Sequence, residues 1–216
     1  MQKGENSAMQ EQMKPMDIEK RSFEIITELL AGRTLDPENE LVIKRAIHTT
    51  ADFDYADNLV FSEHAVQKGI DALRAGCDIV TDTQMARAGI NKTILTSLGG
   101  KVHCFMSDAD VAETAKARGV TRALVSMEKA ATLEKPCIFA IGNAPTALFS
   151  LQALMEAGRL QPALIIGVPV GFVNVVESKE RIIASAHAPY IVARGRKGGS
   201  NVAAAICNAM LYQIKR

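Results

Sequence analysis

From residue 62 onward, short apolar runs alternate along the chain with segments whose apolar residues recur every three or four positions. The apolar runs have the length of strands: CDIVTD (77–82), KVHCFMSD (101–108), CIFAIG (137–142), PALIIGV (162–168) and PYIVAR (189–194). The three-or-four spacing predicts helices over 63–76, 108–119, 121–133, 143–158, 177–185 and 200–214. Strands that alternate with helices need crossover connections. The pattern therefore predicts a three-layer α/β fold with a largely parallel sheet and helices on both faces.

The N-terminal quarter of the chain has a different pattern. Residues 1–16, MQKGENSAMQEQMKPM, are polar and have no periodic apolar face, so we expect a disordered N-terminal extension. From Asp17 the pattern becomes helical, and a second helix is expected over 38–47 with Pro37 in its first turn. Ser62 is expected to cap the helix that follows it. Residues 17–216 are expected to form a single domain.

Composition limits the classes of protein. Hydrophobic residues make up 48% and charged residues 23% of 216 residues, which is the balance of a globular protein. The net charge of +1 gives no global basic field of the kind that attracts nucleic acid, so any anion recognition must be local. Nothing resembles a secretory signal, and no apolar run approaches the ~20 residues of a membrane span. We therefore expect a cytoplasmic protein with no membrane partner.

The cysteines carry no metal or disulfide motif. They are widely spaced, share no CxxC spacing, and lie mostly inside apolar runs: Cys77, Cys104, Cys137 and Cys207. We expect reduced, buried thiols rather than a metal site or a disulfide.

Four segments that follow predicted strands are rich in glycine and small polar residues: Asp82–Gln84, Gly142–Thr146, Gly167–Phe172 and Arg194–Ser200. In open parallel sheets, ligands bind beyond the carboxyl ends of the strands. Glycines let the backbone approach a ligand, and amides at helix starts attract anions. Tight turns also need glycine, so any one loop is compatible with a plain turn. Four such loops at one edge of a sheet favour a large anionic ligand.

These loops match no standard nucleotide motif. The chain has no GxxxxGK[ST], and GRKGGS lacks the GxGxxG spacing. By itself RGRKGGS is compatible with a solvated basic turn or a nucleic-acid contact. The near-neutral charge and the lack of interleaved aromatic residues argue against nucleic acid.

The chain has four histidines: His48, His64, His103 and His187. No HxxxH or HExxH spacing occurs, so local sequence predicts no metal site. His48 closes the helical pattern LVIKRAIH, directly before two threonines. A helix C-terminus favours a protonated imidazole, which titrates near physiological pH. On local grounds, His48 is equally compatible with a general acid and with a structural helix-end residue.

Seven strings identify a resemblance: RSFEII (21–26), KRAIHTTADFDY (44–55), GCDIVTDTQM (76–85), VTRA (120–123), AIGNAPTALF (140–149), IIGVPVGFVNVVESK (165–179) and IVARGRKGGSNVAAA (191–205). They resemble the precorrin-8X / cobalt-precorrin-8 methylmutase family over nearly all of residues 17–212, in the expected order. The first sixteen residues lie outside the resemblance.

The resemblance implies an isomerase of vitamin B12 biosynthesis with a flavodoxin-like fold. The family moves a methyl group from C-11 to C-12 of the macrocycle by a 1,5-sigmatropic shift, giving hydrogenobyrinate from precorrin-8X or cobyrinate from cobalt-precorrin-8. Members are homodimers with active sites near the subunit interface. The HTTAD and VHCF strings look more like the cobalt-handling branch, in which the metal belongs to the substrate. No redox cofactor and no protein-bound metal are expected.

The resemblance also assigns residues. The catalytic histidine of the family falls on His48, and two substrate contacts fall on Ser22 and Arg45. The wider expected set combines cavity positions of the family, the strand-following loops and Thr50 beside the histidine. Its members are Thr50, Thr83, Gln84, Arg122, Gly142, Asn143, Ala144, Gly167, Val168, Val170, Gly171, Phe172, Arg194, Gly195 and Arg196. Arginine and helix-start amides suit the substrate's carboxylates, and apolar side chains suit its macrocycle.

Two other classes of protein are compatible with parts of the sequence. A non-catalytic tetrapyrrole (corrinoid) carrier on the same scaffold would keep the basic loops and would need no titrating histidine. The complete R-x-x-H string around His48 argues against that carrier. A flavodoxin-like or nucleotide-binding module is permitted by the fold, and the missing phosphate loop argues against it.

Overall fold

The computed structural model describes residues 15–215, and its contacts divide the chain into units 1–33 and 34–216. In the first unit, α1 (Pro15–Leu29) begins two residues before the expected start. Its Ser22 hydroxyl donates a hydrogen bond of 2.9 Å to the carbonyl of Ile18. The expected disordered extension lies outside the described residues, apart from residues 15 and 16, which begin α1.

The second unit is built on a six-stranded sheet in the order β1-β6-β5-β4-β2-β3. The strands are β1 (Leu59–Phe61), β2 (Asp78–Thr81), β3 (Val102–His103), β4 (Cys137–Ile141), β5 (Leu164–Gly167) and β6 (Tyr190–Ala193). Strands β2 to β6 pair in parallel, and β1 pairs antiparallel with β6. Counted along the chain, the parallel strands stand in the order 2-1-3-4-5 of flavodoxin-like proteins. The predicted fold class is confirmed.

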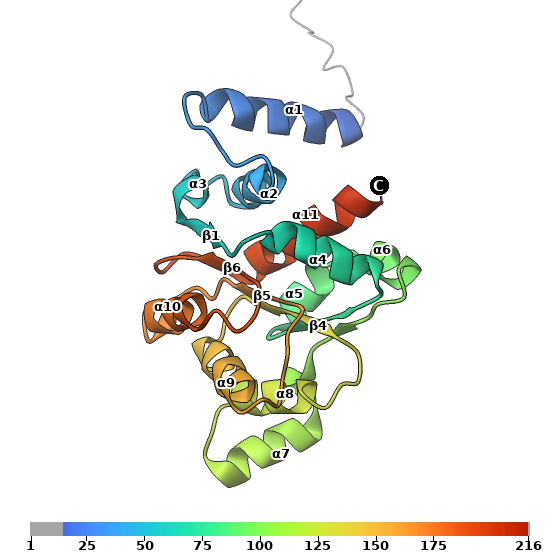
Figure 1. The fold of residues 1–216 in the computed structure, drawn as a ribbon, viewed down its shortest axis with the longest axis vertical. Coiled ribbons are helices and arrows are strands. Elements are labelled where there is room, and N and C mark those ends of the chain that lie inside the picture. The colour runs from blue at the N-terminus through green and yellow to red at the C-terminus, as the bar shows by residue number, and fades with distance from the viewer. Residues whose placement is uncertain (1–14, 216) are drawn as a thin grey trace, which may run out of the picture. The chain divides into compact units, whose positions relative to one another are not determined.

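Helices cover both faces of this sheet (Figure 1). One layer holds α2 (Glu40–Thr50), α4 (Ala65–Arg74), α5 (Gln84–Gly89) and α11 (Ser200–Ile214), with α11 packed against the other three. The other layer holds α7 (Ala109–Arg118), α8 (Arg122–Ala130), α9 (Pro145–Glu156) and α10 (Val175–Ser185), packed in that order. The short α3 (Tyr55–Asn58), α6 (Lys92–Ser97) and the 3-10 turn η1 (Phe105–Ser107) connect these elements.

The core lies between the sheet and the two helical layers. Strands β2, β4 and β5 are buried along their whole length, as expected for parallel strands covered on both faces. On the α9 side, Phe139 and Ile165 pack in one cluster with Leu148, all fully buried. Burying each such side chain contributes about 1.5–3 kcal/mol. On the other side of the sheet, α4 packs closely against α11. A Cβ on Gly69 of α4 would lie 2.6 Å from the Sδ atom of Met210 on α11.

Several local predictions were wrong. The hydroxyl of Ser62 caps no helix, because it accepts the N–H of Tyr190 across the β1–β6 pair at 2.9 Å. The residue before α4 is instead His64, in the left-handed conformation at φ 54°. The second helix begins at Glu40 rather than 38 and continues to Thr50, so it includes its histidine in the last turn.

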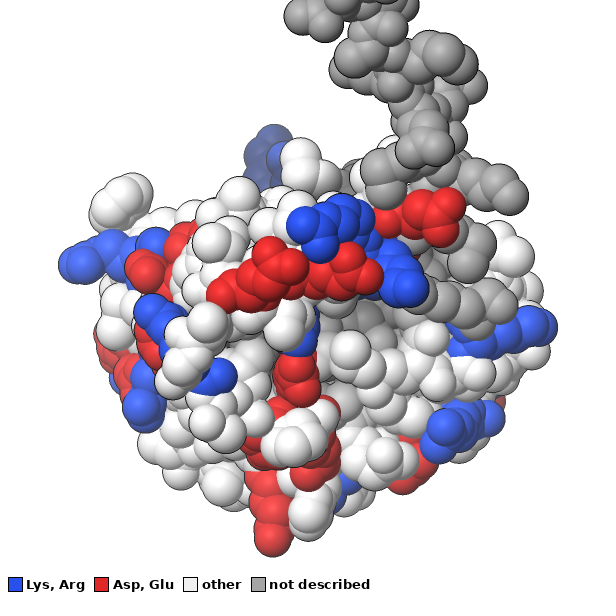
Figure 2. Space-filling view, turned by 90° about the horizontal axis from the view of Figure 1, so that it is seen from above, with Lys and Arg blue, Asp and Glu red and all other residues white. Residues whose placement is uncertain are grey.

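Three further features concern the thiols, the length of the helices and the surface charge. All four cysteines are free and buried, which confirms the prediction for the thiols. No helix within residues 15–215 is long and apolar enough to cross a membrane. On the face seen in Figure 2, basic and acidic side chains are interspersed and form no single basic field.

Candidate active site at the carboxyl edge of the sheet

The order of the parallel strands reverses between β2 and β4, and in flavodoxin-like folds the ligand crevice lies at this point. Asp82, which follows β2 and is only 1% exposed, lies at this point. Its carboxylate accepts the N–H groups of Gly142, Asn143 and Ala144 at 2.8, 2.8 and 2.6 Å. Burial raises the pKa of Asp82, while the three N–H donors act in the opposite direction.

This arrangement changes the expected role of the loop after β4. Its amides were expected to receive anionic groups of a ligand, but they bind a carboxylate of the chain itself. The exposed side chain of Asn143 is the group of this loop that remains available to a ligand. The amides just before α9 are therefore occupied by Asp82 and are not available to a phosphate group.

The loops after β2 and β4 both touch the start of α11. The Thr83 hydroxyl caps α5 by accepting the N–H of Ala86 and lies 2.7 Å from the Ser200 hydroxyl. A Cβ on Gly142 would lie 2.7 Å from the Ser200 Cα, so only glycine fits this approach.

The loops after β5 and β6 are joined in the same way. The Val168 carbonyl accepts the N–H of Gly199 at 2.9 Å, and a Cβ on Gly198 would lie 2.1 Å from that carbonyl oxygen. Gly171 donates to the carbonyl of Arg196 at 3.2 Å. The predicted meeting of the four loops at one edge is therefore confirmed by contacts between them.

The cations of the loop after β6 are used unequally. Arg194 pairs with Glu180 of α10 at 3.2 Å. Lys197 lies 2.6 Å from both Asp52 and Asp54, and these bonds raise the pKa of Lys197 and lower that of Asp52. Among the described residues, Arg196 is exposed and has no ion-pair partner. Of the three cations, Arg196 is the one that the fold leaves available to a ligand.

Lys179 of α10 stabilises the same loop through hydrogen bonds to its backbone. This lysine is 0% exposed, and its Nζ donates to the carbonyls of Gly195 and Lys197 at 2.9 and 2.8 Å. Burial lowers the pKa of Lys179 to about 8.

Helix α2 brings the predicted catalytic histidine to this edge. Arg45 stacks on the ring of Tyr212 near the end of α11, at 5.2 Å, whereas Asp52 pairs with Lys197 just before α11 begins. The two helices are therefore antiparallel, and the C-terminal end of α2 lies toward the carboxyl edge of the sheet. His48 is exposed in that last turn.

A cavity of about 250 Å³ lies between α2 and α11. It is lined by Arg45, Thr49, Gly89, Asn201, Ala204, Ala205, Asn208 and Tyr212. Thr50, expected beside the histidine, donates its hydroxyl to the carbonyl of Ala46 at 2.8 Å. The cavity runs along α11 from Asn201 in its first turn to Tyr212 near its end, and the predicted Arg45 lies at the Tyr212 end.

The apolar segment after β5 is divided between core and surface. Val168, expected as an apolar wall, is fully buried and contributes its carbonyl to the loop contacts, and Gly167 is the last residue of the buried strand β5. Val170, Phe172 and Val173 are 47%, 85% and 78% exposed. Exposed apolar side chains of this size suit contact with an apolar ligand or a protein surface.

Two further predicted residues lie at the same edge. The hydroxyl of Thr121, which caps α8, donates to Thr146 in the first turn of α9 at 3.0 Å, so the exposed Arg122 begins α8 beside the loop after β4. Gln84 is exposed and donates to the Cys104 carbonyl at 3.4 Å. Ser22 belongs to the first unit and is placed only within that unit.

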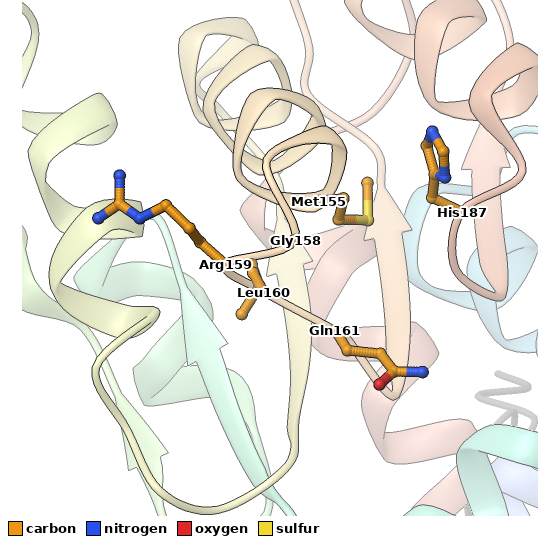
Figure 3. A pocket seen from close by; sticks show the side chains of 6 residues that line it. All are labelled: Met155, Gly158, Arg159, Leu160, Gln161 and His187. Carbon is orange, nitrogen blue, oxygen red and sulfur yellow. The ribbon is translucent and has the colours of Figure 1, made fainter.

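The remaining histidines lie elsewhere. His64 is exposed and 3.0 Å from Glu38, and His103 is 2.8 Å from the buried Asp78. His187 lines a separate cavity of about 370 Å³, together with Arg159 on its other side (Figure 3). This cavity lies at the amino edge of the sheet, before β5 and β6, and holds none of the predicted site residues.

Asp82 and Lys179 were not among the predicted site residues. The signal for Lys179 was present, because its neighbours Val175, Ser178 and Ile182 on α10 are buried at helical spacing. A lysine on that face must find acceptors inside the protein. An aspartate directly after a buried strand was a weaker signal, since it is equally typical of an exposed turn.

Comparisons with known proteins find relatives that match nearly the whole chain. The family profile described as precorrin-8X methylmutase matches residues 17–213. The cobalt-precorrin-8 methylmutase of Salmonella typhimurium is 47% identical over 93% of this chain and 96% of its own length. That of Priestia megaterium is 44% identical over 92% and 88%. The solved precorrin-8x methyl mutase of Thermus thermophilus superposes with a TM-score of 0.81 at 36% identity, covering 90% of this chain and 96% of its own. The chain belongs to the precorrin-8X methylmutase family.

Proposed function

We propose that this chain catalyses the intramolecular transfer of a methyl group from C-11 to C-12 of a precorrin-8 macrocycle. The observation that carries the proposal is the position of His48. In a chain of the methylmutase family, the histidine is exposed at the end of α2 that faces the carboxyl-edge loops. A proton donor at that edge is what the reaction requires.

The chemistry divides into proton transfer and substrate confinement. Protonation of the macrocycle by His48 makes the conjugated system electron-poor, the bond from C-11 to the methyl carbon breaks as the bond to C-12 forms, and the proton then returns. A positioned acid of this kind typically contributes about 10²–10⁴-fold to the rate. Holding the ring in one orientation supplies much of the remainder.

The carboxylates of the substrate are bound by cations at this edge and in the neighbouring cavity along α11. Arg45 lines the cavity between α2 and α11, Arg122 begins α8, and Arg196 is exposed without an ion-pair partner among the described residues. The exposed Val170 and Phe172 offer apolar contact to the macrocycle. Thr83, Gln84, Asn143 and the other loop positions surround this set.

Within this function we propose cobalt-precorrin-8 as the substrate, with cobyrinate as product. The two curated relatives above are named for that cobalt form, and the HTTAD string at 48–52 supports it. The test is incubation with cobalt-precorrin-8 and with precorrin-8X, followed by absorption spectra. The absorption spectrum of the corrin product should appear sooner with cobalt-precorrin-8 than with precorrin-8X. No spectral change with either substrate would refute the proposed activity.

We also propose that residues 17–216 work as one methylmutase domain, as a cytoplasmic homodimer. The family match runs from 17 to 213 across both units, and the exposed apolar residues after β5 suit a subunit contact. Four free, buried thiols suit a reducing compartment. Sedimentation at micromolar concentration should give twice the chain mass of 23.3 kDa, whereas a monomer throughout that range would contradict the dimer.

A further inference from the structure

The loop after β6 has its carbonyl groups bound on one side. The buried Lys179 Nζ donates to the carbonyl oxygens of Gly195 and Lys197 at 2.9 and 2.8 Å, on the side of the loop that faces the protein. In a trans peptide, the carbonyl of one residue and the N–H of the next point in opposite directions. No peptide bond of the described chain is cis. The N–H groups of Arg196 and Gly198 therefore point away from Lys179.

These two N–H groups have no acceptor of their own. Among the described residues, neither the N–H of Arg196 nor that of Gly198 donates a hydrogen bond to the protein. The residue between them, Lys197, is tied by its side chain to Asp52 and Asp54. Within the described part of the chain, the guanidinium of Arg196 in the same segment also has no ion-pair partner. Two N–H donors that alternate along a fixed loop, next to one available cation, suit a carboxylate.

The backbone N–H groups of the loops after β4 and β6 therefore differ in whether they have an acceptor within the protein. After β4, the amides of Gly142 to Ala144 are occupied by the carboxylate of Asp82. After β6, a buried cation binds the carbonyls and leaves the amides for a ligand. An apolar side chain in place of Lys179 would leave these two carbonyls without their donor, and the peptide planes could then rotate.

We propose that Lys179 is a positioning residue that fixes the peptide planes of 195–198, so that the N–H groups of Arg196 and Gly198 and the Arg196 guanidinium bind one carboxylate of the substrate. The identity of that carboxylate as part of a corrinoid rests on the proposed function. The binding groups themselves follow from the loop geometry. Lys179 touches no substrate and acts only through the loop.

The first test measures binding at the two amides directly in the wild-type protein. Cobyrinate is titrated into ¹⁵N-labelled protein, and the amide signals of Arg196 and Gly198 are followed. Both signals should move as the carboxylate binds, more than that of Gly119, which lies at the end of α7. If cobyrinate binds and neither signal moves, the proposal is overturned. This arm needs no variant to fold and no turnover.

The second test removes the lysine. Lys179→Met should weaken cobyrinate binding and raise KM by about 10- to 100-fold, the loss expected for one charge-assisted contact set. The kcat should change less than about threefold, because the acid at His48 is untouched. Lys179→Gln, which keeps N–H donors, should recover part of the affinity. The matched control is Lys129→Met, whose ammonium pairs with Asp108 and Asp110 on α7 and its cap. It should match the wild type.

The outcomes separate the two claims. A folded Lys179→Met with wild-type affinity and KM would overturn the role of Lys179. A drop in kcat with unchanged KM would also overturn it, since that result assigns the lysine to chemistry rather than to binding. Amide signals that respond to cobyrinate in a protein without methylmutase turnover would refute the proposed function and leave the carboxylate site standing.

Discussion

Replacement of Asp82 by alanine should loosen the loop after β4 and lower the stability of the whole second unit. The carboxylate is 1% exposed and accepts three N–H groups of residues 142–144 at 2.6–2.8 Å. Hydrogen bonds to a charged acceptor contribute about 1.5–3 kcal/mol each. Burial of the carboxylate costs free energy that its removal recovers. The N–H groups of Asn143 and Ala144 can also reach water, since neither residue is buried. A net loss of about 2–4 kcal/mol in the free energy of unfolding is therefore expected.

Urea unfolding followed by circular dichroism measures this change. Asp82→Asn should fall between wild type and Asp82→Ala, because an amide oxygen accepts but its NH₂ group opposes an N–H donor. The matched control is Asp110→Ala, which removes an exposed carboxylate paired with Lys129 and should leave the free energy of unfolding nearly unchanged. If Asp82→Ala unfolded within about 0.5 kcal/mol of wild type, the three hydrogen bonds would contribute little and the reasoning would be refuted.

Three further predictions concern binding, thiols and pH. Replacing Arg45 or Arg122 by alanine should weaken cobyrinate binding by about 1–3 kcal/mol each with the fold retained, and spectroscopic titration with unchanged affinity in both would place the carboxylates elsewhere. Burial raises the pKa of Cys77 and Cys137 to about 12, so native protein at pH 8 should react with Ellman's reagent far more slowly than denatured protein; one rapidly labelled thiol would contradict this. Burial lowers the pKa of Lys179 to about 8, below the ~10.4 of an unfolded lysine, so the unfolded chain binds more protons between these values. The free energy of unfolding of wild type relative to Lys179→Met should therefore rise from pH 7.5 to 9.5 in urea unfolding. A fall over this range would contradict the lowered pKa of Lys179.

The parallel core was predictable because its signals are local. Strands β2, β4, β5 and β6 are short apolar runs bounded by polar or glycine residues, and α11 occupies the predicted 200–214. Convergence of the loops at one edge followed from topology alone, since parallel strands end at the same edge. The short α5 and α6, over 84–97, were missed because six-residue helices carry too few positions for a periodic signal.

Long-range partners were not predictable from the sequence. Strand β1 is three residues long and exists through its pairing with β6, so Ser62 pairs with Tyr190 across that strand pair instead of capping α4. The ligand-facing role expected for the amides of 142–144 changed for the same reason, because their acceptor, Asp82, lies 60 to 62 residues earlier. The number of basic residues in a loop also did not indicate how many of them are available to a ligand. Of three cations in 194–197, two are already paired with Glu180, Asp52 and Asp54.

The central claim is that His48 supplies the proton for the methyl shift, and the most direct measurement compares turnover with binding in His48→Ala. The matched control is His64→Ala, an exposed histidine paired with Glu38 away from the site loops. Turnover of cobalt-precorrin-8 by His48→Ala should fall by at least ~10²-fold, while cobyrinate affinity changes by about 1 kcal/mol or less. His64→Ala should keep both. Turnover by His48→Ala at near the wild-type rate would contradict the account and make His48 a helix-end residue without a part in the reaction.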